Sequence, residues 1–305
     1  MPAPQPLDPH HTVAAAVTRA ARVLGLGIAG AVLLALGLGV WRAATSPAAG
    51  KGALVDGLLL AQVILTAALI LLGSMVEGFG HGLSLGTRWP YTRNILALLL
   101  RGDAEAAHRL LATAVGLAAL ALALLQPGYL TYLGLGLILA TALLGMGTLY
   151  VLAGRAPALV HGVHGLLAYL LFLNYLVGLS QPGVHLAPYL DHTFALHAVL
   201  FAILLGGMVT GQRGFGKPLQ EFLVPTRGAQ WMFVAHGFAA LLVLGTLGWL
   251  APVYPVAFGL ALVQAAVGFF VFHAVNLKPK SPGAIVAFHQ AMALLLTAAI
   301  VLGWQ

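Results

Sequence analysis

The sequence contains no cysteine. Disulfides, thiolate metal ligands and cysteine nucleophiles are therefore excluded, and cysteine usage says nothing about the redox compartment. Charge is almost as scarce, because only 7% of the 305 residues are Asp, Glu, Lys or Arg, whereas 61% are apolar or aromatic. A soluble domain carries about a quarter charged residues. The composition therefore indicates a membrane protein, with the lipid bilayer as its main partner.

The charges that remain are mainly positive, with 14 Lys and Arg against 7 Asp and Glu. They form no dense basic patch, so a nucleic-acid partner is not expected. Histidine, in contrast, is plentiful, with 12 residues. In so apolar a chain, histidine is the main residue type able to ligate a metal or move a proton near neutral pH.

Nine stretches are apolar for about 20 residues, the length that spans the hydrocarbon core of a bilayer. They are too long and too uniformly apolar for the alternating strands of a membrane barrel. The sequence therefore predicts an all-α, polytopic membrane protein. The stretches are 19–44, 53–76, 105–126, 129–153, 157–180, 193–211, 229–250, 253–275 and 283–303.

Features of residues 53–180 recur in the same order in residues 193–303. The recurring features are the segment 71–78 with 204–211, His108 with His236, and His164 with His289. The offsets of 133, 128 and 125 residues drift only by loop length. The repeat predicts two pseudo-symmetric four-helix halves, 53–180 and 193–303. Residues 1–52 then form a polar tail and one extra transmembrane helix outside the repeat.

The repeated histidines fall at a similar depth in the predicted bundle. We call the side of the membrane on which the first stretch begins face A. Each of the repeated histidines lies within about the first two turns of its own helix, which enters the membrane from face A. They are His108, His164, His236 and His289. Two imidazoles facing each other across a bundle suit the two axial positions of heme iron, so each half predicts one heme-sized site. Interhelical hydrogen bonding is the alternative role for any single intramembrane histidine.

Several polar residues lie near these histidines. His161 shares the helix face of His164 and is either an alternative ligand or a supporting partner. Glu105 lies three residues before His108 and is expected to point into the same site, where a carboxylate can act in catalysis. The alternative for Glu105 is a carboxylate favoured by the helix dipole, together with Asp103. Five arginines near face A could pair with heme propionates or could simply set the orientation: Arg88, Arg93, Arg109, Arg213 and Arg227.

Three segments of the chain resemble the heme A synthase family, whose members oxidise heme O to heme A for cytochrome oxidase. Residues 105–109, Glu-Ala-Ala-His-Arg, resemble that family's Glu-x-x-His-Arg motif. The segment from Gly73 to Pro90 resembles its glycine-rich loop ending in Trp-Pro, and His289-Gln290 lies in the last helix as in the family. The resemblance covers about residues 53–303.

The resemblance implies a role for each half. His236 and His289 would ligate a permanent heme b, while His108 and His164 would flank the substrate heme O. Glu105 would serve the successive hydroxylation of a ring methyl to a formyl group. Phe233 occupies the position in the second half that matches Glu105, so only the first half carries the carboxylate. The expected protein partner is heme O synthase or an oxidase assembly partner, and the expected location is the plasma membrane of a prokaryote.

Two questions stay open at the level of sequence. Twelve of the 14 basic residues fall on face A, which would make it cytoplasmic by the positive-inside rule, whereas the family places its heme-bearing face outside. Either the extra helix inverts the molecule, or the arginines serve propionates, or the stretch 19–44 does not span. The chain could also be a di-heme b-type electron-transfer protein without oxygenation chemistry, or a heme carrier or assembly factor.

Overall fold

The computed structural model describes residues 9–48, 50–90 and 94–303, and of residues 9–22, 24, 25 and 28 it describes only the backbone. These ranges form eleven α-helices and contain no β-strand. The helices are α1 (Pro9–Thr45), α2 (Lys51–Gly78), α3 (Ile95–Leu100), α4 (Ala104–Leu125), α5 (Tyr129–Leu152), α6 (Ala158–Ser180), α7 (Leu186–His192), α8 (Phe194–Arg213), α9 (Gly228–Trp249), α10 (Pro255–Leu277) and α11 (Ile285–Gly303).

Eight of the described helices are long and apolar enough to cross a membrane, namely α2, α4, α5, α6, α8, α9, α10 and α11. The predicted all-α, polytopic membrane fold is confirmed. The first helix contributes a shorter apolar stretch, Ala29–Thr45. Two short helices, α3 and α7, were not predicted, and they lie within the connections between the long helices.

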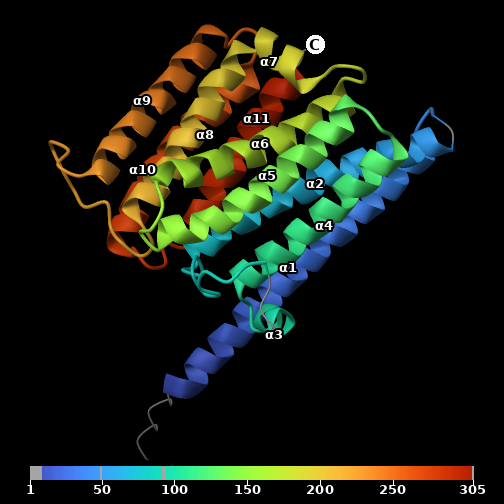
Figure 1. The fold of residues 1–305 in the computed structure, drawn as a ribbon. Helices are drawn as coiled ribbons and strands as arrows, with labels where there is room; N and C mark the ends of the chain where they lie inside the picture. The colour runs from blue at the N-terminus through green and yellow to red at the C-terminus, as the bar shows by residue number, and fades with distance from the viewer. Residues whose placement is uncertain (1–8, 49, 91–93, 304–305) are drawn as a thin grey trace, which may run out of the picture.

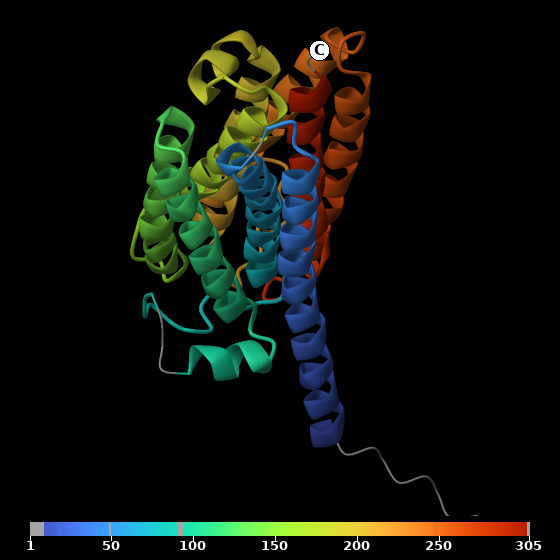
Figure 2. The same cartoon turned by 90° about the vertical axis from the view of Figure 1, so that its right-hand side faces the viewer.

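The N-terminal helix begins ten residues earlier than expected. Residues 9–18, predicted as part of a polar tail, are helical from Pro9 onward. Proline is well tolerated in the first turn of a helix, and the alanines at 14–16 have the highest helix propensity. Figure 2 shows that α1, in dark blue, extends well past the ends of the other long helices on face A.

The contacts between the long helices follow a similar order in residues 53–180 and in residues 193–303 (Figure 1). In the first half α2 contacts α4 and α5 contacts α6, and in the second half α8 contacts α9 and α10 contacts α11. The contacts between halves also match, because α6 packs on α8 and α2 packs on α11. The central helices α6 and α2 have 50% and 44% of their apolar windows buried, against 17% for the outer helix α10.

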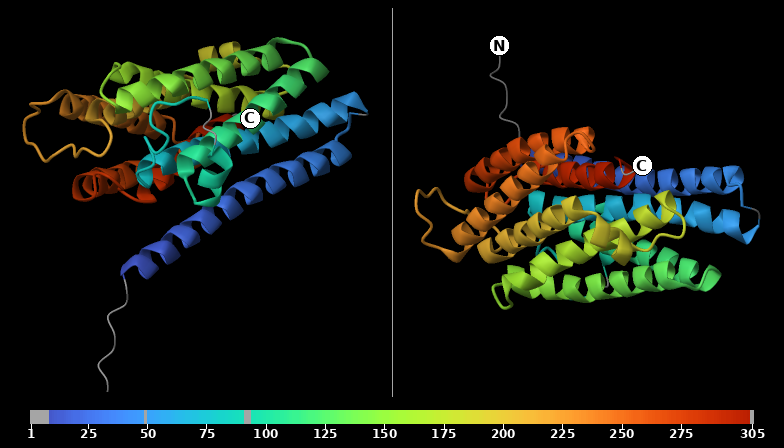
Figure 3. Two further views of the ribbon diagram at one scale, coloured as in Figure 1. Left: turned by 60° about the horizontal axis from the view of Figure 1, so that its bottom comes forward. Right: turned by 90° about the horizontal axis from the view of Figure 1, so that it is seen from above.

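Helix α1 lies outside this arrangement and covers α2 and α4 (Figure 3). Its backbone comes very close to α2, since a Cβ placed on Gly57 would lie 2.3 Å from the carbonyl oxygen of Gly39. Small residues at a crossing allow this approach, which is how membrane helices gain packing energy without a hydrophobic drive between them.

Candidate functional site

Each of the four repeated histidines packs its imidazole against a glycine on a neighbouring helix. A Cβ on Gly73, Gly145, Gly206 or Gly268 would lie 3.1, 3.3, 3.1 or 3.3 Å from the Cε1 atom of His108, His164, His236 or His289, respectively. These separations are shorter than ordinary van der Waals contact. The bare face of glycine is therefore what admits each ring to its position.

The imidazoles of His164 and His236 each contact a backbone carbonyl one helical turn before their glycine. His164 bonds through Nδ1 to the carbonyl oxygen of Thr141, and His236 bonds through Nδ1 to that of Ala202, both at 3.0 Å. Thr141 precedes Gly145 by four residues, and Ala202 precedes Gly206 by four. Residues four apart share one helix face, so a missing Cβ at the second position exposes the carbonyl of the first.

This hydrogen bond determines the chemistry of the ring. A carbonyl oxygen only accepts, so Nδ1 must carry the proton in His164 and His236. Nε2 of each neutral imidazole is then left with its lone pair. Metal-binding histidines commonly donate their other ring N–H to a backbone carbonyl in this way. Both rings are therefore set up to offer Nε2 to a metal.

The other two histidines vary this arrangement. His108 interacts with the carbonyl of Leu69, four residues before Gly73, although its Nδ1 falls outside hydrogen-bond limits for any described group. His289 differs more, because its Nε2 lies 3.3 Å from the side-chain nitrogen of Gln264, four residues before Gly268. The Gln264 amide donates to Nε2, which again makes Nε2 the atom with the lone pair.

The structure brings the histidines together in two pairs. His108 and His164 are close enough to interact electrostatically, as are His236 and His289. Each pair thus contains two imidazoles, of which His164 and His236 offer Nε2 as a ligand while Nε2 of His289 is bound by Gln264, and a pair of imidazoles is a donor set that fits the two axial positions of heme iron. The partners Gly145, Gly268 and Gln264 were not singled out from the sequence. The sequence signal that could have found them is the recurrence of a glycine between the two halves: Gly145 and Gly268 are 123 residues apart, and each follows Thr141 or Gln264 by four residues.

His161 lies elsewhere, at the contact between the two halves. Gly207 and Gly211 of α8 pack against its backbone and its Cβ, respectively. Its Nδ1 is buried and makes no hydrogen bond with a described group, and the ring interacts electrostatically with His164 and Arg213. His161 is therefore a neighbour of the first histidine pair, and its ring lacks the contact with a glycine that the other four rings share.

Glu105 is buried, and its contacts do not include His108. Its Oε1 pairs with Arg109 at 2.5 Å, and its Oε2 accepts hydrogen bonds from the Ser84 hydroxyl at 2.9 Å and the Leu85 N–H at 3.1 Å. Both oxygens thus bind groups on α4 and on the loop that follows α2. The expected direction toward His108 is not seen among these contacts.

The arginines proposed for propionates have different settings. The guanidinium of Arg109 is already bound within the protein, because it pairs with Glu105 and also donates to the carbonyls of Arg88 and Pro90. The side chains of Arg88 and Arg227 are exposed near face A. Arg93 lies outside the described residues.

A buried ion pair that the sequence did not reveal joins the two halves. Arg213, at the end of α8, pairs with Glu77, near the end of α2, and also donates to the carbonyls of Lys217 and Pro279. Ionisable groups inside a membrane protein are costly to bury and are usually paired. Glu77 stands out only as one of seven acids in the chain.

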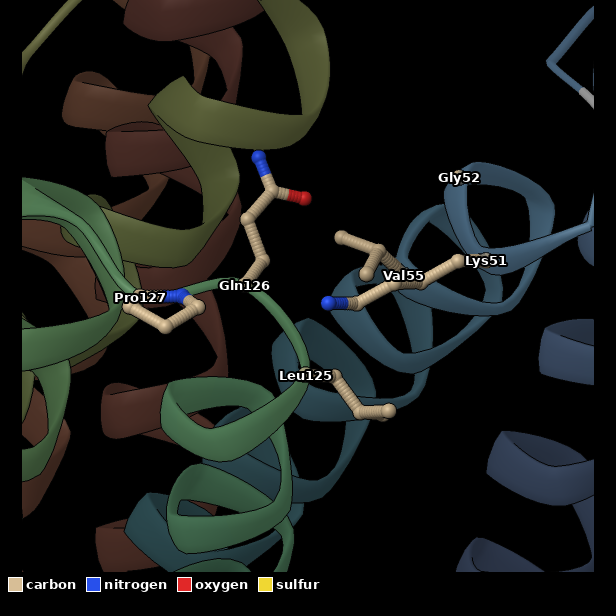
Figure 4. A pocket seen from close by; sticks show the side chains of 6 residues that line it. All are labelled: Lys51, Gly52, Val55, Leu125, Gln126 and Pro127. Carbon is tan, nitrogen blue, oxygen red and sulfur yellow. The ribbon is translucent and has the colours of Figure 1, made fainter.

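A shallow hollow of about 300 Å³ lies at the opposite end of the bundle (Figure 4). Its lining comes from the start of α2 and the end of α4. The lining residues are Lys51, Gly52, Val55, Leu125, Gln126 and Pro127. The repeated histidines lie near the other ends of their helices, so this hollow is separate from the candidate site.

Fold and site together define a polytopic all-α membrane protein with two internally repeated histidine pairs. Comparison with protein families, with curated proteins and with solved structures finds no match to this chain.

Proposed function

We propose that the chain is a membrane heme protein of the heme A synthase type, which oxidises heme O to heme A with the help of a bound heme b. One observation carries the proposal: four histidines, in matched positions of a repeat, each rest on a glycine, and in His164 and His236 a carbonyl bond at Nδ1 leaves Nε2 as the lone-pair donor. Interhelical hydrogen bonding alone does not require a glycine at the same place beneath each ring.

The two pairs would divide the work. His236 and His289 would hold heme b, whose iron supplies one-electron redox chemistry when bound. His108 and His164 would hold the substrate heme O while its ring methyl is oxidised to a formyl group by successive hydroxylation, with an external oxidant accepting the electrons that are released. The carbonyl bonds of His164 and His236 fix the rotation of each ring, and so hold each Nε2 in one orientation.

A second candidate is a di-heme b-type electron-transfer protein. The contacts of Glu105 favour it, because both carboxylate oxygens are already bound by Arg109, Ser84 and Leu85. A carboxylate held in this way has both oxygens engaged by the protein itself. Both candidates need the same two histidine pairs, so ligation alone does not separate them.

Mass analysis of the hemes extracted from the purified full-length protein separates the candidates. After expression with a source of heme O, the proposal expects hydroxylated or formylated heme beside heme b. Two equivalents of heme b, with no oxidised product, would identify the electron-transfer protein instead. In the control variants, His236→Ala and His289→Ala should remove heme b, whereas Gly237→Ala should leave it bound, because a Cβ at Gly237 meets no atom within 4 Å.

The cellular setting follows from the same proposal. Eight helices of the described ranges are long and apolar enough to span a membrane, which makes the chain an integral, multi-pass membrane protein. A prokaryotic plasma membrane, and a heme O synthase or an oxidase assembly partner that supplies the substrate, complete the proposed setting. Co-purification of that partner from mild detergent tests this part.

A further inference from the structure

We propose that Glu105 is a positioning residue, which fastens the loop of residues 79–90 over the face-A end of the first half. We further propose that Phe233 fastens the corresponding loop of the second half by a different kind of contact. The inference rests on the proposed function only in assigning a heme to the space that each loop covers.

Five polar contacts hold the first loop against the start of α4. Glu105 accepts from Ser84 and Leu85, Arg109 donates to the carbonyls of Arg88 and Pro90, and Asp103 faces His81. The distances are 2.9 and 3.1 Å for Glu105, 2.6 and 3.1 Å for Arg109, and 3.4 Å for Asp103. The ion pair between Glu105 and Arg109 connects the two principal fasteners.

The loop crosses from α4 to the far side of the same half. A Cβ on Gly82 would lie 3.3 Å from Leu152, the last residue of α5, and 3.0 Å from the ring of Phe215. Leu85 of this loop is buried. Because His108 lies one turn inside α4, the loop covers the end of the bundle nearest the first histidine pair. Figure 2 shows this loop at the lower end of the molecule, below α4.

The second half uses aromatic rings at the matched position. Phe233 stands 128 residues after Glu105, and its ring lies 6.2 Å, edge to face, from Phe222 in the loop of residues 214–227. On its other side Phe233 lies 4.8 Å from Phe272 of α10. One position of the repeat therefore holds the face-A loop in both halves, by hydrogen bonds in the first and by ring packing in the second.

The two loops are held by contacts of different kinds. In the first half, opening the loop leaves the buried carboxylate of Glu105 without its partners, and each buried polar group left unsatisfied costs about 1–3 kcal/mol. In the second half, opening the loop separates two phenyl rings and exposes apolar surface. Each loop can therefore be loosened by a substitution that leaves the other loop in place.

Amide hydrogen exchange in lipid nanodiscs tests the fastening without any heme. Ser84→Ala removes one bond to Glu105, and Glu105→Ala removes both, so exchange in peptides from residues 79–90 should rise by about tenfold or more. Ser84→Thr, which keeps the hydroxyl, should restore the original rate. Ser180→Ala, which loses a comparable bond near the opposite face, is the control. Equal exchange in all these proteins would overturn the proposal.

Hemin transfer to an excess of apomyoglobin tests the consequence. Ser84→Ala should speed the hemin release phase that His108→Ala abolishes, by about tenfold, and leave the other phase unchanged. Phe233→Leu should speed the other phase and leave the phase that depends on His108 unchanged. If both variants change both phases equally, the loops are not separate covers. If no histidine-dependent hemin binding occurs, the proposed function fails, while the exchange experiment still decides whether Glu105 holds the loop.

Discussion

The guanidinium of Arg213 pairs with the carboxylate of Glu77 across the boundary between the two halves, with side-chain exposures of only 3% and 16%. The same guanidinium donates to backbone carbonyls at Lys217 and Pro279, so it joins the ends of α2 and α8 to the connection between α10 and α11. A nearby backbone bond, from Gly283 N–H to the carbonyl of Gly78, reinforces that junction.

Glu77→Gln should destabilise the protein strongly. Removing one partner of a buried ion pair leaves the other charge uncompensated, at a cost of about 3–5 kcal/mol. Thermal unfolding in detergent, followed by circular dichroism, measures the change. The matched control is Asp56→Asn, which breaks the half-exposed pair of Asp56 with Arg42 at 3.6 Å and should cost no more than about 1 kcal/mol. Similar losses in the two variants would refute the structural role of the buried pair.

Gly206→Ala should weaken hemin binding in the second half. The added methyl would stand 3.1 Å from Cε1 of His236, so the ring must move and lose its bond to Ala202. Overpacking of this kind costs about 1–3 kcal/mol, which corresponds to roughly a tenfold loss or more of affinity. Hemin titration followed in the Soret band checks it, with Gly237→Ala as the neighbouring control. If both variants titrate like the original protein, the contact between Gly206 and His236 has no role in hemin binding.

Gln264→Leu should tighten hemin binding by His289. In the structure the Gln264 amide donates to Nε2 of His289, and that bond must break before Nε2 can bind iron. A bond of this kind contributes about 0.5–1.5 kcal/mol, so affinity should rise between about twofold and tenfold. The same Soret titration measures this change. A loss of affinity would mean that the amide supports the ligand rather than competing for it.

Asp103→Asn should lower stability in a way that depends on pH. Burial alone would raise the pKa of Asp103, but the bonds from His81 and from the Ala106 N–H outweigh it, and the pKa is lowered. A lowered pKa means that the carboxylate stabilises the fold above its unfolded pKa of about 3.9, and that this gain is lost as the pH falls through the folded value. The variant should therefore be less stable by about 1 kcal/mol at pH 7, where Asp103 caps α4.

The comparison of melting curves at pH 7 and below about pH 3.9 completes this test. The gap between the original protein and Asp103→Asn should shrink at the acid pH. A gap that stays constant would show that hydrogen bonding, which Asn can partly keep, matters more than the charge.

The long helices were predictable because their apolar length is imposed by the membrane, and no tertiary contact overrides it. The first residue of α1 could not be predicted in this way, because apolarity marks where a helix enters lipid and does not mark where the helix itself begins. The four histidines were found through their repeat. Their supports at Gly145, Gly268 and Gln264 were missed, because a glycine in a membrane helix has many uses and only the folded structure shows the ring above it.

Glu105 shows a different limit of sequence reasoning. Its spacing from His108 placed both on one face of α4, but it did not reveal the competing partners. Arg109 lies four residues on, and Ser84 and Leu85 arrive from a loop twenty residues earlier. A carboxylate turns toward the strongest donors in reach, and a single helix does not show which donors a loop will bring.

His108, His164 and His236 each contact the main chain of the residue one turn before their glycine, whereas His289 contacts the side chain of Gln264. The three residues contacted through their main chain are Leu69, Thr141 and Ala202, whose side chains have nothing in common. Replacement of these three side chains is therefore compatible with an unchanged position of the ring, whereas a Cβ at any of the glycines would press on the imidazole. A duplicated chain built on this contact can change the polarity around each metal-binding ring independently, one half at a time, without rebuilding the support.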